Sequence, residues 1–195
     1  MENEVKEPAF KYNYITPAEY LAAERAAEEK HEYYDGQVLA MSGASLKHNR
    51  IQSNLLINIG YYLKGKNCQI LPGDMRISTP AHDAYMYADA SIVCGEPQLE
   101  DDKFDTLLNP SVIFEILSPS TRSIDKGRKL FFYQRIPSLQ EFIMIDSLQK
   151  NIQLVCKQSN GAWQFETIMD PTKALFIKTI GFHPPLEEIY TNTGL

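Results

Sequence analysis

The apolar residues in the first third of the chain predict two helices joined by a β-hairpin. Residues 16–19 read TPAE, a helix start with a capping box, and the helix is expected to run to about residue 30. A second helix is expected between Ser45 and Gly65, where apolar residues recur at helical spacing: Ile51, Leu55, Ile59 and Tyr62. Between the helices, Asp-Gly within strand-like residues 31–41 predicts a hairpin turn.

From residue 68 the pattern changes to short apolar runs separated by turn-forming residues. A helix is expected from Asp125, as its cap, through about Arg135, and strands are expected at 68–78, 85–94, 111–117, 141–146, 152–156 and 163–169, with a last element near 186–190. This order predicts an α/β or α+β fold, a mixed sheet flanked by helices behind an N-terminal helix and hairpin. Residues 1–13 are expected to form a flexible tail and residues 14–195 a single domain.

One carboxylate interrupts the most apolar of these strands. The stretch NPSVIFEILSPST, residues 109–121, has turn-forming residues at both ends, and its centre is typical of a strand buried on both faces. Alternation places Glu115 on the same face as Ile113 and Leu117. Since an isolated ionised carboxylate is costly to bury, Glu115 must be protonated, paired with a cation or bound to a metal.

The composition is that of a globular protein with a sizeable core. Of the 195 residues, 44% are hydrophobic, and no apolar run approaches the roughly 18 residues of a membrane span. The N-terminus MENEVKEPAF is acidic and polar, unlike a signal peptide, so we expect a cytoplasmic protein. Cys68, Cys94 and Cys156 are widely spaced in or beside apolar segments, which favours reduced core thiols over disulfides.

The net charge of −6 argues against broad, non-specific adhesion to nucleic acid, which needs a basic surface. It leaves room for an enzyme that acts on nucleic acid through a local basic cleft. Other kinds of site find little support. The stretch GYYLKGKN has a helix before it and a strand after it, the reverse of a phosphate-binding loop. The four histidines are not spaced as zinc ligands, and no GxSxG nucleophile elbow exists.

A second acid, Asp89, lies on the expected strand that precedes the one with Glu115. Alternation within 85–94 places Asp89 on the face opposite the apolar one. Because successive strands are usually neighbours in a sheet, the two carboxylates can converge and hold a hard cation such as Mg²⁺, which favours phosphate substrates. The alternative is that Asp89 is a solvated strand residue and Glu115 forms a buried ion pair with a lysine or arginine.

Lys129 is a candidate for a catalytic cation. It lies four residues before Tyr133 in the expected helix, beside the face that should meet the sheet. A lysine next to two metal-bound carboxylates can orient the attacking water and stabilise the charge that develops on the phosphorus centre. The alternative is an ordinary surface lysine.

Asp on one strand, Glu on the next and a nearby Lys resemble the PD-(D/E)XK superfamily, which has the restriction-endonuclease-like fold. Over residues 14–190 the chain is similar to the Uma-type family of endonucleases, and the most specific segments are EILSPST and DKGRKLFFY. The resemblance implies an α/β core with a mixed sheet, Mg²⁺ or Mn²⁺ as cofactor, DNA as substrate and a homodimer.

The resemblance also assigns residues. Asp89 and Glu115 take the places of the two metal-binding acids, and Glu32 matches an auxiliary acid. His48 and Asp74 match other motif positions, which implies supporting roles.

Two residues depart from the family pattern. Ala88 stands where a proline is usual, which removes no ligand. Leu117 stands where the superfamily has its lysine, so the lysine must come from the following helix, with Lys129 as the first candidate and Lys126 as the reserve. The same substitution is also consistent with a lost activity.

The leading hypothesis is therefore a metal-dependent DNA endonuclease that uses Asp89, Glu115, Lys129 and Glu32. The first alternative is a catalytically inactive nucleic-acid-binding or protein-binding module that keeps the nuclease fold. The second is a purely structural ion pair between Glu115 and Lys129, with no metal.

Overall fold

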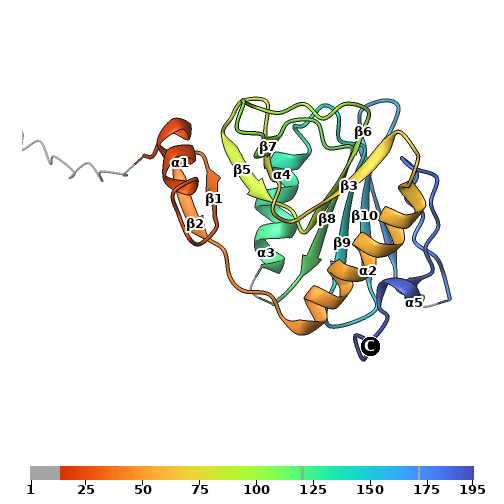
Figure 1. The fold of residues 1–195 in the computed structure, drawn as a ribbon. Coiled ribbons are helices and arrows are strands. Elements are labelled where there is room, and N and C mark those ends of the chain that lie inside the picture. The colour runs from red at the N-terminus through yellow and green to blue at the C-terminus, as the bar shows by residue number, and fades with distance from the viewer. Residues whose placement is uncertain (1–13, 120, 171) are drawn as a thin grey trace, which may run out of the picture.

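The structure is a computed structural model that describes residues 14–119, 121–170 and 172–195, so the expected tail at 1–13 lies outside the described residues (Figure 1). Its helices are α1 (Pro17–Glu24), α2 (Leu46–Leu63), α3 (Arg122–Ile124), α4 (Leu130–Tyr133) and α5 (Leu186–Ile189), with a π-helical segment η1 (Asp125–Lys129) between α3 and α4. Its strands are β1 (His31–Tyr34), β2 (Gln37–Ala40), β3 (Cys68–Pro72), β4 (Arg76–Ser78), β5 (Ala84–Tyr87), β6 (Ala90–Cys94), β7 (Thr106–Leu107), β8 (Val112–Leu117), β9 (Glu141–Asp146), β10 (Ile152–Lys157) and β11 (Trp163–Ile168).

The strands form two mixed sheets, where the sequence predicted one. The first has the order β2-β1-β5-β4-β7, and its only parallel pair is β4 with β7. The second has the order β11-β10-β9-β8-β6-β3, and its only parallel pair is β8 with β9. The predicted α/β fold with a mixed sheet flanked by helices is confirmed, and so is the expected adjacency of β6 and β8.

A bent hairpin connects the two sheets. Strands β3 and β6 pair in the second sheet, and their continuations β4 and β5 pair in the first. The bend lies at Gly73 and Asp89, between the Pro72–Ala90 pair of one sheet and the Arg76–Tyr87 pair of the other. The continuous strands expected at 68–78 and 85–94 are therefore wrong. Asp89 lies at the junction of the sheets and not on one strand face.

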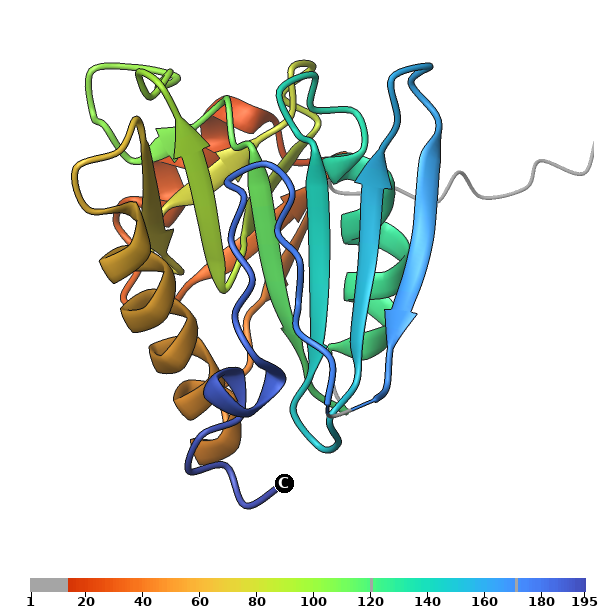
Figure 2. The same ribbon diagram turned by 90° about the vertical axis from the view of Figure 1, so that its right-hand side faces the viewer.

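The second sheet separates two apolar cores. On one face, α2 and the C-terminal segment cover Val112, Phe114 and Ile116 of β8. On the other face, α4 and the first sheet cover Ile113 and Leu117, as alternation predicted. Figure 2 shows α2 and the C-terminal segment in front of this sheet and the α3–α4 helix behind it. All six residues of β8 are buried, which confirms a strand buried on both faces.

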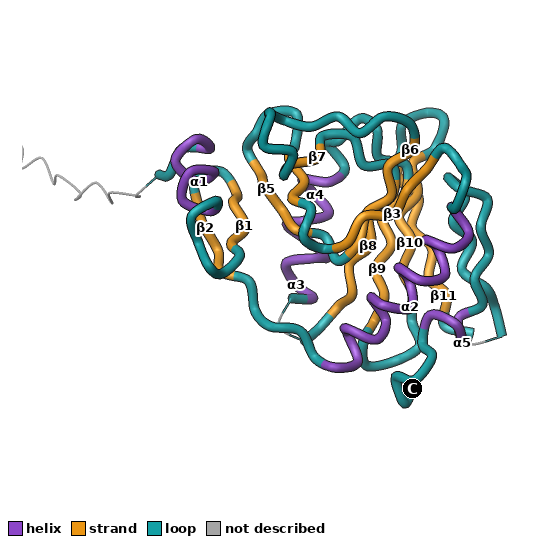
Figure 3. The backbone as a smooth tube through the Cα atoms, viewed as in Figure 1, coloured by secondary structure: helices purple, strands orange, loops and turns teal. Residues whose placement is uncertain are grey.

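The β1–β2 hairpin forms one end of the first sheet, with α1 packed against it, and residues 41–45 lead from the hairpin to α2 (Figure 3). The hairpin turn at Asp35-Gly36 and the Ser45 cap of α2 are confirmed. The helix α1 ends at Glu24, about six residues earlier than expected. It stops there because the Glu24 carboxylate accepts a hydrogen bond from the backbone N–H of His31, at 2.9 Å, and so ties the chain into β1.

The helix expected from Asp125 begins earlier and contains a wide turn. Thr121 is its N-cap residue, and the backbone N–H of Thr121 donates to the Ser118 hydroxyl. Asp125 therefore lies inside the helix, in η1, and not at its cap. Both Asp125 and Lys129 are buried in this wide turn, which is the kind of local irregularity that often marks a functional site.

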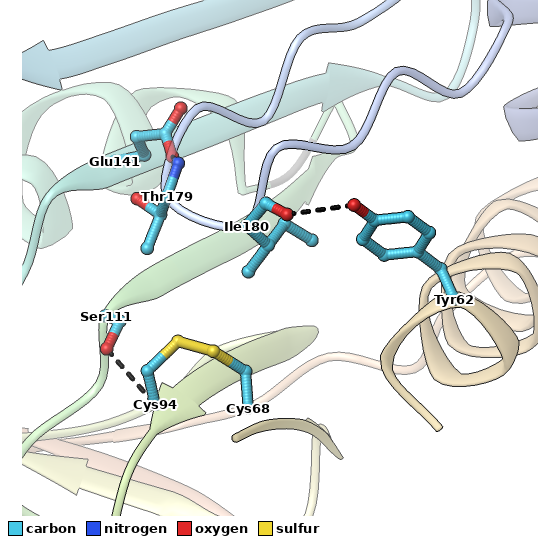
Figure 4. The surroundings of a disulfide bond; sticks show 7 residues. All are labelled: Tyr62, Cys68, Cys94, Ser111, Glu141, Thr179 and Ile180. Atoms are coloured by element: carbon cyan, nitrogen blue, oxygen red, sulfur yellow. Dashed lines mark hydrogen bonds between the residues drawn. A yellow bond between two sulfur atoms is a disulfide. The ribbon is translucent and has the colours of Figure 1, made fainter. Parts of the chain in front are cut away.

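The prediction of three reduced thiols is wrong for two of the cysteines. Cys68 and Cys94 lie directly opposite each other on the antiparallel strands β3 and β6, and they form a disulfide (Figure 4). They are 26 residues apart in the sequence, so only the pairing of the strands reveals their contact. Cys156 is free and half-buried. Among the described residues, no helix is both long and apolar enough to cross a membrane.

Candidate active site

A cavity of about 340 Å³ lies where the two sheets meet the N-terminal end of α2 and the helix that follows β8. Five of the predicted site residues line it: Asp89, Glu115, Lys129, His48 and Asp74. The mouth is exposed, since the Asp74 side chain is 86% accessible and that of Lys30 41%. The floor is nearly sealed, because Glu115 and Lys129 are only 3% and 5% accessible.

Asp89 is held from three sides. Its Oδ2 accepts a 2.6 Å hydrogen bond from the backbone N–H of Ile116, and its Oδ1 lies 3.1 Å from Nε2 of His48. Its carbonyl oxygen accepts a 2.7 Å bond from the Gln52 side chain of α2. The bond to Ile116 ties the Asp89 carboxylate to the residue that follows Glu115, and both acids line the same cavity.

Glu115 bonds directly to the predicted lysine. Its Oε1 accepts hydrogen bonds from Lys129 Nζ at 3.0 Å and from the Tyr133 hydroxyl at 2.9 Å. Among the described residues, none donates a hydrogen bond to Oε2. One oxygen of Glu115 is therefore occupied by the helix behind the sheet, and the other remains available as a ligand.

Lys129 is held by three acceptors inside the protein. Besides its bond to Glu115, its Nζ donates a hydrogen bond to the carbonyl oxygen of Tyr87 at 3.1 Å and lies 2.9 Å from Oε1 of Glu32 in an ion pair. Asp125 lies 3.7 Å away on the same helix. Lys129 is thus the cationic centre of a buried acidic cluster and not a surface lysine.

Glu32 lies behind Lys129 and does not line the cavity. Its Oε1 also accepts a hydrogen bond from the backbone N–H of Tyr87, and its Oε2 accepts one from the Tyr34 hydroxyl. This auxiliary acid of β1 therefore anchors Lys129 from the first sheet, while Glu115 holds it from the second.

The cluster around Lys129 contains more carboxyl groups than cationic groups. Burial raises the pKa of Glu115 well above its usual value, with Asp125, Asp89 and Glu32 adding to the rise and Lys129 opposing it. Burial also raises the pKa of Asp125. Burial opposes the charge of Lys129, yet Glu115 and Glu32 together raise the pKa of this lysine well above its usual value. A further positive charge at this point would offset the excess of carboxylates.

The remaining predicted residues differ in their distance from the buried cluster. His48 lies on the first turn of α2 against Asp89, and its Nδ1 is buried with no hydrogen-bond partner among the described residues. Asp74 lies in the β3–β4 turn at the mouth and pairs with Lys30. Lys126 does not line the cavity and forms no ion pair with a described residue, so only the first lysine candidate belongs to the cluster.

Sequence reasoning missed three residues of this site. Tyr133 was used only to place the helix face, although its hydroxyl bonds Glu115. Asp125 was taken for a helix cap, although its spacing of four from Lys129 was a usable signal. Gln52 carried no signal, because a polar residue on a helix is ordinary, and its bond to Asp89 depends on how α2 packs.

The donor set fits a hard divalent cation. Mg²⁺ uses one or two carboxylates and keeps several waters, and Asp89 and Glu115 supply two carboxylates on one cavity. Among the described residues, no group of three or more His, Cys, Asp or Glu side chains is arranged to hold a metal ion. That rules out a closed site of protein ligands among them but not a hydrated one. None of the described residues that line the cavity is a cysteine, so the donor set does not suit a soft metal.

Residues 17–183 match the family model of Uma2, which is described as "Putative restriction endonuclease". The chain belongs to the Uma2 family. The resemblance inferred from the motif residues is therefore confirmed, and membership supports a nuclease role. In this Uma2 protein the matched residues include both sheets, the cavity and every candidate site residue.

Two relatives come from Synechocystis sp. strain PCC 6803. The uncharacterized protein sll1609 is 34% identical over 155 residues, which cover 80% of this chain and 88% of that protein. The uncharacterized protein slr1290 is 32% identical over 183 residues, 94% of this chain and 95% of that protein. Both alignments extend over most of each chain.

A solved structure has the same fold. It is a crystal structure described as "a putative nuclease belonging to DUF820 from Anabaena variabilis", with a TM-score of 0.75. The match covers 90% of the present chain and 97% of the Anabaena chain, at 19% sequence identity. At this identity the comparison establishes the fold alone.

Proposed function

We propose that this Uma2 protein is a metal-dependent endonuclease that hydrolyses phosphodiester bonds in DNA, with Mg²⁺ or Mn²⁺ as cofactor. The observation that carries the proposal is the convergence of Asp89 and Glu115 on one cavity, where the backbone N–H of Ile116 fixes the Asp89 carboxylate. Family membership supports the class of reaction.

Asp89 and Glu115 would hold the cation. Asp89 is fixed by Ile116 and His48, and Glu115 is fixed through Oε1 by Lys129 and Tyr133. When bound, such a cation polarises the scissile phosphate and lowers the pKa of a coordinated water. The protein's part is to keep both carboxylates in place before the substrate arrives, which reduces the cost of reorganisation.

Lys129 would act as a fixed positive charge. Its Nζ already donates hydrogen bonds to Glu115 and to the carbonyl oxygen of Tyr87 and forms an ion pair with Glu32, so protein groups fix its position. From its present position it opposes the charge that builds up on the phosphate and keeps Glu115 in place. Glu32 would serve the reaction through Lys129, since it does not line the cavity.

The test is cleavage of plasmid and oligonucleotide DNA with and without Mg²⁺ or Mn²⁺ by the wild type and by Glu115→Gln, which keeps the size of the side chain and an oxygen acceptor. We expect cleavage by the wild type only with the cation, and none by a folded Glu115→Gln. Equal activity of the two proteins, or no cleavage by the wild type under any condition, would end the proposal.

One observation favours a second candidate, an inactive binding module that keeps the nuclease fold. Glu115 and Lys129 bond directly, and Leu117 occupies the place of the superfamily lysine. A module of this kind would bind its partner without a cation and tolerate Glu115→Gln. The melting temperature in MnCl₂ separates the candidates, because a cation that binds only the folded state raises it.

A further inference from the structure

We infer that the nuclease acts on unpaired DNA, single strands or unpaired segments within a duplex, and cuts intact duplex poorly. The inference rests on the proposed function and names the substrate class of the same site. Its first basis is the depth of Glu115 in the cavity. Glu115 is 3% accessible at the floor of the cavity, whereas Asp74 and Lys30 at the mouth are exposed. A scissile phosphate must therefore enter the cavity to reach both carboxylates.

The size of the cavity is the second basis. At about 340 Å³ it lies at the lower end of the range of roughly 300–1,000 Å³ that holds small molecules. This volume suits about one nucleotide and not a stacked duplex. Enzymes whose target lies in a pocket act on single strands or extrude the nucleotide, and extrusion costs unpairing and unstacking energy.

The lining of the cavity is the third basis. Met41, Leu56 and Ile116 line it together with the charged residues, so an unstacked base would meet apolar side chains beside the carboxylates. Unpaired bases are commonly held through such contacts to their exposed faces, whereas a paired base buries its faces in the helix stack. Residues 41–44, between β2 and α2, are exposed and line the mouth together with Lys30 and Asp74.

Charge is the fourth basis. The lining holds four carboxylates, Asp74, Asp89, Glu115 and Asp125, and two lysines, Lys30 and Lys129, an excess of two negative charges. Both lysines are already paired with acids. Four of the arginines, Arg25, Arg76, Arg122 and Arg135, are also paired with aspartates. Duplex-binding proteins grip many phosphates with free cations, and the described residues that line this cavity offer no unpaired lysine or arginine.

The experiment uses one labelled sequence as a single strand, as a full duplex and as a duplex with an unpaired flap, with the full-length protein and Mn²⁺. We expect the single strand and the flap to be cut at least about tenfold faster than the duplex, because extrusion of a paired nucleotide is then avoided. Duplex cut as fast as single strand would overturn the inference and leave the proposed function standing.

If no DNA is cut, the proposed function is contradicted. The preference for unpaired DNA can then still be tested by measuring DNA binding. Fluorescence anisotropy with the same three oligonucleotides in Mn²⁺ should show tighter binding of the unpaired forms. The logarithm of the binding constant should fall with the logarithm of salt concentration with a slope of about −1 to −2, as for two or three phosphate contacts. Equal affinity for duplex, or a slope as steep as −5, would contradict the inference.

A variant at the mouth of the cavity tests whether the DNA strand enters there. Gly43 lines the cavity, and a Cβ added there would meet nothing within 4 Å. Gly43→Phe should narrow the entrance and lower cleavage or binding of the single strand at least about fivefold. The shift of melting temperature caused by Mn²⁺ should stay as in the wild type, because the two acids are untouched. If folded Gly43→Phe cleaves and binds the single strand as the wild type does, entry of the strand through this mouth is contradicted.

Discussion

Lys129 Nζ lies 3.0 Å from Glu115 Oε1, and this contact joins the helix after β8 to the strand that carries the proposed metal ligand. Leu117 stands two residues after Glu115, where the resemblance implies a lysine, and we propose that Lys129 at the end of the π-helical segment η1 supplies that charge instead. In this arrangement the lysine comes from a different element and is held by protein acceptors.

Removal of this lysine should destabilise the fold. Lys129→Ala would leave Glu32, Glu115 and Asp125 buried without their cation, so we expect the free energy of unfolding to fall by about 3–5 kcal/mol. Lys126→Ala is the matched control, since Lys126 neither lines the cavity nor pairs with a described residue, and its change should stay within about 0.5 kcal/mol. Urea unfolding measures both, and equal effects of the two variants would show that Lys129 is not the centre of the cluster.

The bend between the sheets should depend on Gly73. A Cβ there would lie 3.1 Å from the carbonyl oxygen of Ala88 and 3.2 Å from that of Asp89, so Gly73→Ala must push the two strands apart. We expect a loss of about 1–3 kcal/mol of stability, together with weaker Mn²⁺ binding because Asp89 shifts.

Gly127→Ala is the control for Gly73→Ala, because a Cβ at Gly127 meets nothing within 4 Å and the position does not line the cavity. Chemical denaturation and the shift of melting temperature in MnCl₂ compare the two variants with the wild type. A Gly73→Ala protein as stable as Gly127→Ala would show that the strands tolerate the added methyl group.

Much of this architecture follows from the sequence. The spacing of apolar residues gave α2, the Asp-Gly pair gave the β1–β2 hairpin, and alternation gave the correct face for Glu115. These features are local, so a short window of residues determines them. The convergence of Asp89 and Glu115 also followed from the rule that successive strands pair, and β6 does pair with β8.

The rest depends on contacts that no local pattern encodes. The residues of β5 and β6 are apolar on both sides of Asp89, so nothing in the pattern marks the passage from one sheet to the other. The π-helical segment moved Asp125 from the expected cap position to the interior. The disulfide needed the pairing of β3 with β6. The expected homodimer stays a prediction, which sedimentation of the full-length protein can test.

The disulfide between Cys68 and Cys94 should stabilise the protein. It closes a separation of 26 residues and joins the edge strand β3 to β6, so the loop-entropy relation predicts a contribution of about 3.5 kcal/mol. Dithiothreitol should lower the melting temperature of the wild type and leave that of Cys94→Ser unchanged. Cys156→Ser should respond to reductant like the wild type. A wild-type protein that melts identically with and without reductant would contradict the bond.

Asp105 should make the fold sensitive to acid. Its carboxylate accepts hydrogen bonds from Arg25 and lies 2.8 Å from Arg76, and chiefly the Arg25 bonds hold the pKa of Asp105 far below its usual range. A pKa that is lower in the folded than in the unfolded state gives stability above the unfolded value of about 4, and this stability is lost as the pH falls.

The Asp105→Asn variant tests whether Asp105 causes the loss of stability at low pH. Urea unfolding between pH 6 and pH 3 should show a shallower loss of stability in the variant than in the wild type, because the amide does not titrate. Parallel pH profiles of the two proteins would assign the acid sensitivity to other carboxylates.

The most direct test of the central claim, that Asp89 and Glu115 together hold a divalent cation, is anomalous diffraction from crystals grown with Mn²⁺. We predict one strong anomalous peak in the cavity, in contact with an oxygen of each carboxylate and with Lys129 still beside Glu115. The absence of a peak there at saturating Mn²⁺, with Glu115 bonded only to Lys129 and Tyr133, would contradict the claim and leave a structural ion pair in its place.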